Sequence, residues 1–419
     1  MRASATAHRI GRNATSRLGA QVASRLTAIV LVALIGRLAG AEALGLYALV
    51  TGATAIASTL ADLGLTPYLT REIAAATSDD AQAAVLADVL TLKLTTAALA
   101  AALLIGGGWL WAPAMHGILT LAAIAVIPEA ATQTIAAVMN GRQRMEISSG
   151  LQVAVRLSAL VGTGLALQGH GGLIGVFLAL LVAQMLGSVW HWVVLHRWRI
   201  IPALWRRRPG WCLHIRQALP FAATNLLASV YSRADLLLIG AWRGSTEAGL
   251  YHAAYRLWEA VGLIPASLLD AMYPEMARRA ARGDRAAVLS RWLALGWRPL
   301  LIAGGTLSAV GIALAPLAIR LVFGDRGYGE AVLPLRVLMA SAPAMFLYLL
   351  SGHLLYAVGY QTRVTRVMAT VAAINLALNL FIIPRFGLMG ASVVALASEW
   401  LLAGLMCGAA KKTNEARQR

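Results

Sequence analysis

The chain has 419 residues, of which 59% are hydrophobic and only 13% are charged, and its formal net charge is +18. Soluble globular domains run at roughly 45–50% apolar and about 25% charged residues, so the composition argues against a soluble enzyme, and the high hydrophobicity argues against disorder. Because one helical span takes about 20 apolar residues, the composition predicts an all-α polytopic membrane protein with roughly a dozen spans.

Twelve apolar runs, separated by Gly, Pro or charged residues, are long enough to cross a bilayer. Their length predicts helices, because a transmembrane barrel strand is about ten residues long and alternates in polarity. The predicted spans are 17–36, 46–66, 85–107, 116–137, 150–168, 172–193, 217–240, 249–271, 295–318, 332–357, 364–384 and 388–409.

Basic residues are distributed unevenly between the two sides of these spans. With the N-terminus on the inside, 24 of the 36 Lys and Arg residues fall in inner segments, five in outer loops and seven within spans. The bias predicts a multi-pass membrane protein with an even number of spans and both termini in the cytoplasm. The positive charge is therefore a topology signal and an attraction to anionic lipid headgroups, and nucleic acid is not an expected partner.

The sequence contains an internal repeat. Residues 34–47, LIGRLAGAEALGLY, match residues 238–251, LIGAWRGSTEAGLY, at seven of fourteen positions, and GLIG at 172–175 is echoed by GLMG at 387–390. The matches predict two six-helix pseudo-repeats in the same orientation, as in transporters with parallel repeats. The expected domains are an N-terminal lobe over 1–193, a basic cytoplasmic linker over 194–216, and a C-terminal lobe with a cytoplasmic tail over 217–419.

Several stretches resemble a known family. They are RLGAQVASRLTAIVLVALIGRLAGAEALGLYAL, TLADLGLTPYLTREIA, YSRADLLLIG, AGLYHAAYRL and AAINLALNLFIIPRFGLMGASVVALASEW. Together with twelve spans in two halves, they are similar to the Wzx-type polysaccharide (oligosaccharide-lipid) flippases of the MOP exporter superfamily, which also contains the lipid II flippases and the MATE drug exporters. The resemblance covers nearly the whole chain, although its motifs are mostly turn glycines and helix faces.

The resemblance implies a V-shaped pair of six-helix lobes around a central cavity. It also implies transfer of a polyprenyl-diphosphate-linked oligosaccharide from the inner to the outer leaflet, for O-antigen, capsule or exopolysaccharide synthesis. The partners that follow are the lipid-linked glycan, a polysaccharide polymerase and glycosyltransferases. The resemblance does not identify the glycan.

Three arginines lie within predicted spans on the helices that the repeat pairs with each other. Arg25 is near the middle of the first span, Arg233 in the outer half of the seventh, and Arg256 in the eighth. A charge at this depth is costly, and guanidinium forks bind phosphate oxygens in pairs, so we expect these residues to contact the diphosphate. Pairing inside the membrane is the alternative, and Glu259, three residues after Arg256, is a suitable partner.

The remaining charges within the spans divide by depth. Glu399, Glu129 and Asp235 are candidates for coupling to a proton or sodium gradient, and Glu399 stands where the other repeat has the neutral Gln184. Pairing between helices is the alternative role for these acids and for the buried Lys93. Charges nearer to span ends are expected to reach the headgroups or water, namely Arg156, Arg298, Arg336, Asp62, Asp88 and Asp270.

Motifs of enzymes are not found. The sequence has no Walker A, HExxH or GxSxG motif, and its two cysteines form no CxxC. The expected protein is therefore not an enzyme and needs no metal or cofactor, with alternating access as its mechanism. A MATE-like small-molecule exporter, a membrane-embedded polysaccharide polymerase or ligase, and a structural scaffold are the alternatives. An acid-lined cavity would favour the exporter, and the short outer loops argue against the polymerase.

Overall fold

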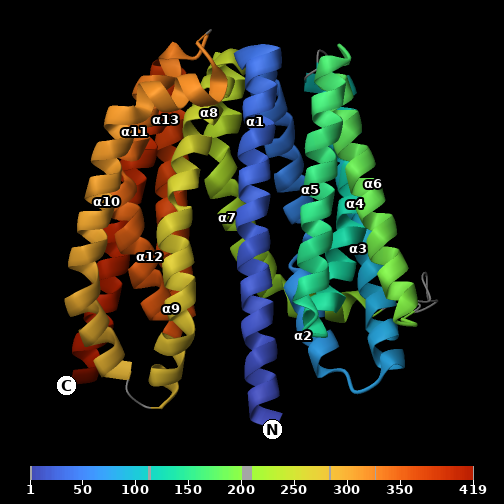
Figure 1. Cartoon of the computed structure of the whole chain (residues 1–419), viewed down its shortest axis with the longest axis vertical. Coiled ribbons are helices and arrows are strands. Elements are labelled where there is room, and N and C mark those ends of the chain that lie inside the picture. Colours follow the sequence, from blue (N-terminus) through green and yellow to red (C-terminus); the bar gives the residue numbers. More distant parts are fainter. Residues whose placement is uncertain (1, 112–114, 201–209, 283–284, 326, 419) are drawn as a thin grey trace. The chain divides into compact units, whose positions relative to one another are not determined.

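The computed structural model describes residues 2–111, 115–200, 210–282, 285–325 and 327–418, and the regular elements in this part of the chain are all helices (Figure 1). Their order is α1 (Arg2–Asp62), α2 (Leu65–Ala75), α3 (Asp79–Trp111), α4 (His116–Gly141), α5 (Met145–Gln168), α6 (Gly172–Arg197), α7 (Trp211–Arg243), α8 (Ser245–Val261), α9 (Leu263–Ala281), α10 (Arg285–Phe323), the 3₁₀ turn η2 (Gly329–Ala331), α11 (Val332–Met339), α12 (Ala342–Ala357) and α13 (Gln361–Gln418).

Seven described helices are long and apolar enough to cross a membrane, and the bent pair Gly329–Met339 and Ala342–Ala357 makes an eighth candidate. The two longest contain two predicted spans each, because a glycine interrupts them. Gly40 breaks α1 with φ 88° and ψ 177°, and Gly387 breaks α13 with φ 56° and ψ −139°. Only glycine visits these conformations readily. The prediction of an all-α polytopic membrane protein is confirmed.

The backbone repeats where the sequence repeats. Gly40 corresponds to Gly244, which has φ 92° and ψ 175° before α8, almost the same conformation. Gly172, which begins α6, has φ 55°, and its counterpart Gly387 has φ 56°. These two pairs of identical glycines therefore set equivalent turns between spans in the two copies of the repeat.

Two compact units make up the chain. Unit 1 comprises Met1–Ala39 and Leu46–Arg233, and unit 2 comprises Gly40–Gly45 and Ala234–Arg419. The helix α7 thus contributes to both, with its part up to Arg233 packed in unit 1. Residues 201–209 of the expected linker lie outside the described residues, and the lobe boundaries drawn from the sequence stay a prediction.

Unit 1 is organised around α4. Figure 1 shows α3, α4, α5 and α6 running side by side, and α4 packs against both α3 and α6. The second predicted span, 46–66, is too long by four residues, because Leu63 and Gly64 have left-handed φ values of 47° and 73° and end α1 at Asp62. The amphipathic helix α2 follows, and its Leu65, Tyr68, Leu69 and Ile73 are buried against α3 and α4.

The start of α7 is attached to α2 and α3 by polar contacts. Burial raises the pKa of the Tyr68 phenol, whose oxygen forms a hydrogen bond with His214 Nδ1 at 2.8 Å. The Nε2 atom of His214 faces Asp88 Oδ2 at 3.6 Å. These contacts fix the first turn of α7 to unit 1.

Unit 2 is organised around α12, which packs against α9, α10 and α13 (Figure 1). The second half of α13 begins at Gly387, and its first turn is held by Glu247 of α8. The Glu247 carboxylate accepts hydrogen bonds from the Leu388 amide at 3.2 Å and from Arg243 Nε at 2.9 Å. A carboxylate at this position complements the unpaired amides and the positive end of the helix.

The two turns of the repeat meet within unit 2. A methyl group placed on Gly45 would overlap the carbonyl oxygen of Ser245, and one placed on Gly249 would overlap the carbonyl oxygen of Ala41. Gly45 and Gly249 occupy equivalent positions of the repeat, so each copy presents its glycine to the other. Backbones approach this closely only where a side chain is absent, as in small-residue helix crossings in membranes.

We expect Gly45→Ala and Gly249→Ala each to destabilise the protein by about 1–3 kcal/mol or more, because backbone at the crossing has to move to admit the methyl group. The measurement is the thermal unfolding midpoint of the purified protein in detergent. Gly150→Ala in α5 is the control, since its added methyl group meets no atom within 4 Å. Equal midpoints for the three variants would contradict the crossing.

Candidate functional site

The three predicted arginines lie on α1, α7 and α8. Arg25 is exposed and Arg233 is half-buried, both in unit 1, and Arg256 is half-buried in unit 2. Within the described residues, Arg25 and Arg233 make no hydrogen bond or ion pair through their side chains. Their guanidinium groups therefore keep their full donor capacity for a ligand.

Arg256 is engaged within its own helix. Its Nη1 lies 2.6 Å from Glu259 Oε2, and its Nε donates to His252 Nε2 at 3.3 Å. The alternative role considered for Arg256, pairing with Glu259, is thus present in the structure. His252 was not identified from the sequence, although its four-residue spacing from Arg256 places both on one helix face.

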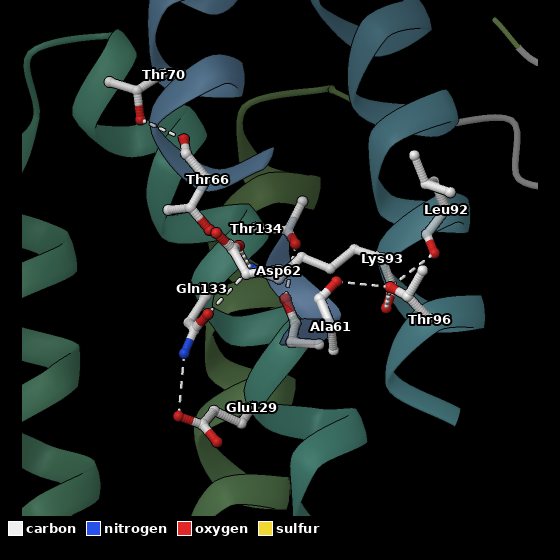
Figure 2. A network of polar contacts seen from close by, with 11 residues as sticks. Ala61, Asp62, Thr66, Thr70, Leu92, Lys93, Thr96, Glu129, Gln133 and Thr134 are labelled. Atoms are coloured by element: carbon white, nitrogen blue, oxygen red, sulfur yellow. Dashed lines mark hydrogen bonds and ion pairs between the residues drawn. The ribbon is translucent and has the colours of Figure 1, made fainter. Parts of the chain in front are cut away.

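A buried polar network connects four helices of unit 1 (Figure 2). The ammonium group of Lys93 on α3 is 2.5 Å from Asp62 Oδ1 at the end of α1, 2.7 Å from Thr66 Oγ1 on α2, and 3.0 Å from Gln133 Oε1 on α4. Gln133 Nε2 in turn donates to Glu129 Oε1 at 3.0 Å. Lys93 is 1% exposed and Asp62 is 8% exposed, so these contacts replace water.

The direction of each hydrogen bond in this network follows from chemistry. An ammonium group has three donors and no acceptor, and the three contacts of Lys93 use all of them. Gln133 must therefore turn its carbonyl oxygen to Lys93 and its amide nitrogen to Glu129. Thr66 accepts from Lys93 and donates to Asp62. Glu129 accepts hydrogen bonds from both Gln133 and Ser58. The network built on Lys93 thus contains one cation and two carboxyl groups.

Asp62 corrects an expectation from the sequence. Its place near a span end suggested a solvated or capping carboxylate, but it is buried and paired with Lys93. The reason is the turn at Leu63 and Gly64, after which Thr66 of α2 donates a hydrogen bond to Asp62, while Lys93 of α3 pairs with it. The sequence also missed Gln133 and Thr66, since neutral polar residues in a helix give no signal of what they contact.

Asp235 on α7 lies in unit 2 and is buried. Oδ1 accepts a hydrogen bond from the Leu236 amide at 2.8 Å, and Oδ2 accepts one from the hydroxyl of Tyr251 on α8. The contact joins α7 to α8, which is one of the two roles considered for this residue. Its role in ion coupling stays a prediction.

Glu399 is 5% exposed and lies in the second half of α13. The preceding residue, Ser398, accepts a hydrogen bond from Asn375 Nδ2 at 2.9 Å, and Asn379 Nδ2 donates to Asn375 Oδ1 at 3.0 Å. These amides come from the first half of α13, so polar contacts join its two halves. Asn375 and Asn379 were not identified as candidates from the sequence.

An apolar cavity of about 450 Å³ lies in unit 1, between the second part of α1 and α3. Ala53, Ile56, Leu60, Leu99 and Leu103 contribute to its lining. Thr96 also lines it, but its hydroxyl donates to the Ala61 carbonyl at 2.7 Å. The wall is therefore chemically suited to hydrocarbon.

The chain matches the family model described as polysaccharide biosynthesis protein over residues 10–279, well over half its length. The chain belongs to this family. The MatE family model matches residues 220–381, within the second half. A search of curated proteins finds no match.

Several solved structures align with nearly the whole of this chain. Lipid II flippase MurJ in an inward closed conformation aligns with a TM-score of 0.77 at 10% identity, covering 94% of this chain and 86% of that chain. An inward-facing MATE family multidrug resistance transporter aligns with a TM-score of 0.75 at 13% identity, covering 96% and 98%. A MOP superfamily transporter from Pyrococcus furiosus aligns with a TM-score of 0.65 at 12% identity, covering 98% and 96%. The fold is that of the MOP superfamily transporters.

For this family member, we expect Lys93→Met to destabilise unit 1 by about 3–5 kcal/mol, because the Asp62 carboxylate is left buried without its cation. Adding Asp62→Asn to Lys93→Met should recover a large part of the loss. The measurement is the thermal unfolding midpoint of the single and double variants. Arg278→Met is the matched control, since its pair with Glu275 is exposed and contributes at most about 1 kcal/mol. A single variant as stable as the wild type would contradict a structural role for the pair.

Proposed function

We propose that the protein is a flippase that moves a polyprenyl-diphosphate-linked oligosaccharide from the inner to the outer leaflet of the bacterial inner membrane. The observation that carries the proposal is the family match over residues 10–279, a stretch that contains Arg25, Arg233 and Arg256. The glycan serves O-antigen, capsule or exopolysaccharide synthesis, and the membrane-embedded partners are the glycosyltransferases that build it and the polymerase that uses it.

The sign of the charges supports a phosphorylated substrate. A diphosphate offers several anionic oxygens, and guanidinium groups bind such oxygens in a planar, two-pronged geometry. The guanidinium groups of Arg25 and Arg233 have no hydrogen-bond partner among the described residues, so all their donors are available to such a ligand. Exporters of cationic compounds need the opposite charge.

The proposed mechanism is alternating access. The diphosphate and sugars occupy a cationic site that opens first to the cytoplasm and then to the far side, while the polyprenyl chain stays in hydrocarbon. Both termini lie in the cytoplasm, as the distribution of basic residues indicates. The basic inner segments also hold anionic headgroups of the surrounding lipids.

An ion gradient supplies the energy, and Glu129 is the group whose surroundings best support this role. Its network holds one ammonium group and two carboxyl groups, Asp62 already neutralises Lys93, and the further cation Arg156 acts on Glu129 more weakly than Lys93 does. A second carboxylate in an apolar interior is least costly when it carries a proton. Glu129 therefore binds a proton in the closed network and releases it when the network opens. Asp235 and Glu399 are the corresponding candidates in unit 2.

We expect Arg25→Ala and Arg233→Ala each to weaken binding of the diphosphate by roughly 30-fold, about 2 kcal/mol, and to abolish surface polysaccharide. Lysine at either position should restore export only in part, because an ammonium group keeps the charge but loses the fork. The assay is complementation of a deletion strain, with the protein level in the membrane measured by blot.

Arg336→Ala is the matched control for these variants. Its guanidinium is exposed and donates to the Ile312 carbonyl at 3.2 Å, which is a local contact of unit 2. Export should stay normal in this variant. Full export by the Arg25→Ala, Arg233→Ala double variant would refute the anion site, and the two residues would then be structural.

A MATE-like exporter is the second candidate function, because the MatE family model matches residues 220–381. The two candidates differ in the charge of the ligand. Protection of cells from cationic dyes, with surface polysaccharide unaffected by deletion of the gene, would favour the exporter.

We expect Glu129→Gln to leave the protein folded while export loses most of its rate, because the amide mimics the protonated acid but cannot release a proton. The residual export should no longer respond to a protonophore, which slows the wild type. Glu330→Gln, at an exposed position of η2, is the control. Normal, protonophore-sensitive export by Glu129→Gln would exclude this carboxyl group, and the same assay on Asp235→Asn and Glu399→Gln would then test unit 2.

A further inference from the structure

The polar face of α8 is present in only one copy of the repeat. With the offset of 204 that aligns the two copies, His252, Arg256 and Glu259 correspond to Ala48, Gly52 and Ala55. Since the turns before the two helices have the same backbone conformation, the scaffold is common and does not require these three side chains. Their presence in unit 2 calls for a role beyond folding.

Arg256 contacts His252 and Glu259, and these two partners differ in how firmly they are held. Because a guanidinium group only donates, His252 Nε2 must accept from Arg256 Nε, and the ring is neutral with its proton on Nδ1. The His252 residue is 3% exposed, so it is held in place by packing. The Glu259 side chain is 42% exposed, and among the described residues its carboxylate is held by the contact with Nη1 alone.

The Glu259 carboxylate occupies a guanidinium donor that a phosphate oxygen can also use. The carboxylate and a phosphate compete for the same cation, so a phosphate that takes over this N–H of Nη1 displaces Glu259. The Arg256–Glu259 pair lies three residues apart on one helix, and breaking it requires a rotation of side chains rather than a separation of helices. A partly exposed pair of this kind is weak, so a more highly charged anion can displace the carboxylate.

We propose that Glu259 is a competitor built into the anion site at Arg256, and that it selects diphosphate over monophosphate and helps to release the substrate. This inference rests on the proposed function, because it assumes that Arg256 meets the lipid-linked diphosphate. When the site is empty, Glu259 neutralises Arg256. When a diphosphate arrives, its larger charge displaces the carboxylate, whereas a monophosphate gains less from the exchange.

Release follows from the same competition. A transporter that binds its substrate tightly in both leaflets would stay occupied, and differential affinity is what moves an equilibrium between states. Glu259 lowers the affinity of the site wherever the carboxylate can reach Arg256, and it replaces the departing phosphate so that Arg256 is not left unpaired. His252 is a positioning residue that keeps the guanidinium within reach of both anions.

The test measures binding of two soluble probes, farnesyl diphosphate and farnesyl monophosphate, to the purified full chain in detergent. We expect Glu259→Gln to lower the Kd for the diphosphate roughly two- to five-fold. The Kd for the monophosphate should fall by a larger factor, so the preference for diphosphate shrinks. Glu259→Asp, whose carboxylate is one methylene shorter, should give an intermediate effect. Thermal unfolding midpoints verify that each variant is folded.

Glu275→Gln is the matched control, because Glu275 forms the same kind of within-helix pair with Arg278 and Arg279 on α9. Its probe affinities should equal those of the wild type. Arg256→Gln separates the two levels of the argument. If it leaves both affinities unchanged, Arg256 is not part of an anion site and the proposed substrate contact fails. Alternatively, Arg256→Gln weakens binding of the probes, and Arg256 is then part of an anion site. If Glu259→Gln and Glu259→Asp then leave the preference for diphosphate unchanged, or if they too weaken binding, Glu259 only supports Arg256 and the competitor role is wrong.

Discussion

The structure depends on one constraint, which is that a polar group inside an apolar bilayer must find its partner within the protein. Lys93 meets it by using all three ammonium donors, and threonines such as Thr91 and Thr134 meet it by bonding the carbonyl of the preceding helical turn. The same constraint makes helices the only regular elements among the described residues. It also means that each charged side chain in a span has either an internal partner or a task that involves a ligand.

The repeat distinguishes residues that both copies need for folding from residues that only one copy carries. Gly40 with Gly244, and Gly172 with Gly387, have matching backbone conformations, and Gly45 with Gly249 form the crossing where the two copies meet. These positions are shared because the turns need them. The buried charges are distributed differently, since the Lys93 network belongs to unit 1, and Asp235 and the Arg256 pair belong to unit 2. The chemistry of the two units has therefore diverged on a common backbone, which is expected if each contributes a different step.

Sequence patterns predicted the elements of the fold because run length and hydrophobicity decide membrane insertion. They did not predict the breaks at Gly262 and at Ser341, because a helix can bend or restart without any change of hydropathy. Spacing along one helix predicted the Arg256–Glu259 pair. It could not predict that Lys93 pairs with Asp62, since those residues lie on different helices and only the tertiary fold brings them together. The substrate role of Arg25, Arg233 and Arg256 stays a prediction, because it requires a ligand to test it.

The placement of the polar networks bears on how such a protein can move. Lys93 joins α1, α2, α3 and α4 within unit 1, and Glu247 joins α7, α8 and α13 within unit 2. Contacts of this kind are costly to break in a low-dielectric interior, because each would leave a charge unpaired. A motion that keeps each unit rigid preserves them all, whereas a motion that bends a unit through its network must provide water or a proton in exchange. Glu129 meets the Lys93 network through Gln133, and Glu259 meets Arg256 through Nη1. The proton exchange proposed at Glu129 and the phosphate exchange proposed at Glu259 each change these contacts and leave the Lys93–Asp62 pair and the Glu247 contacts in place.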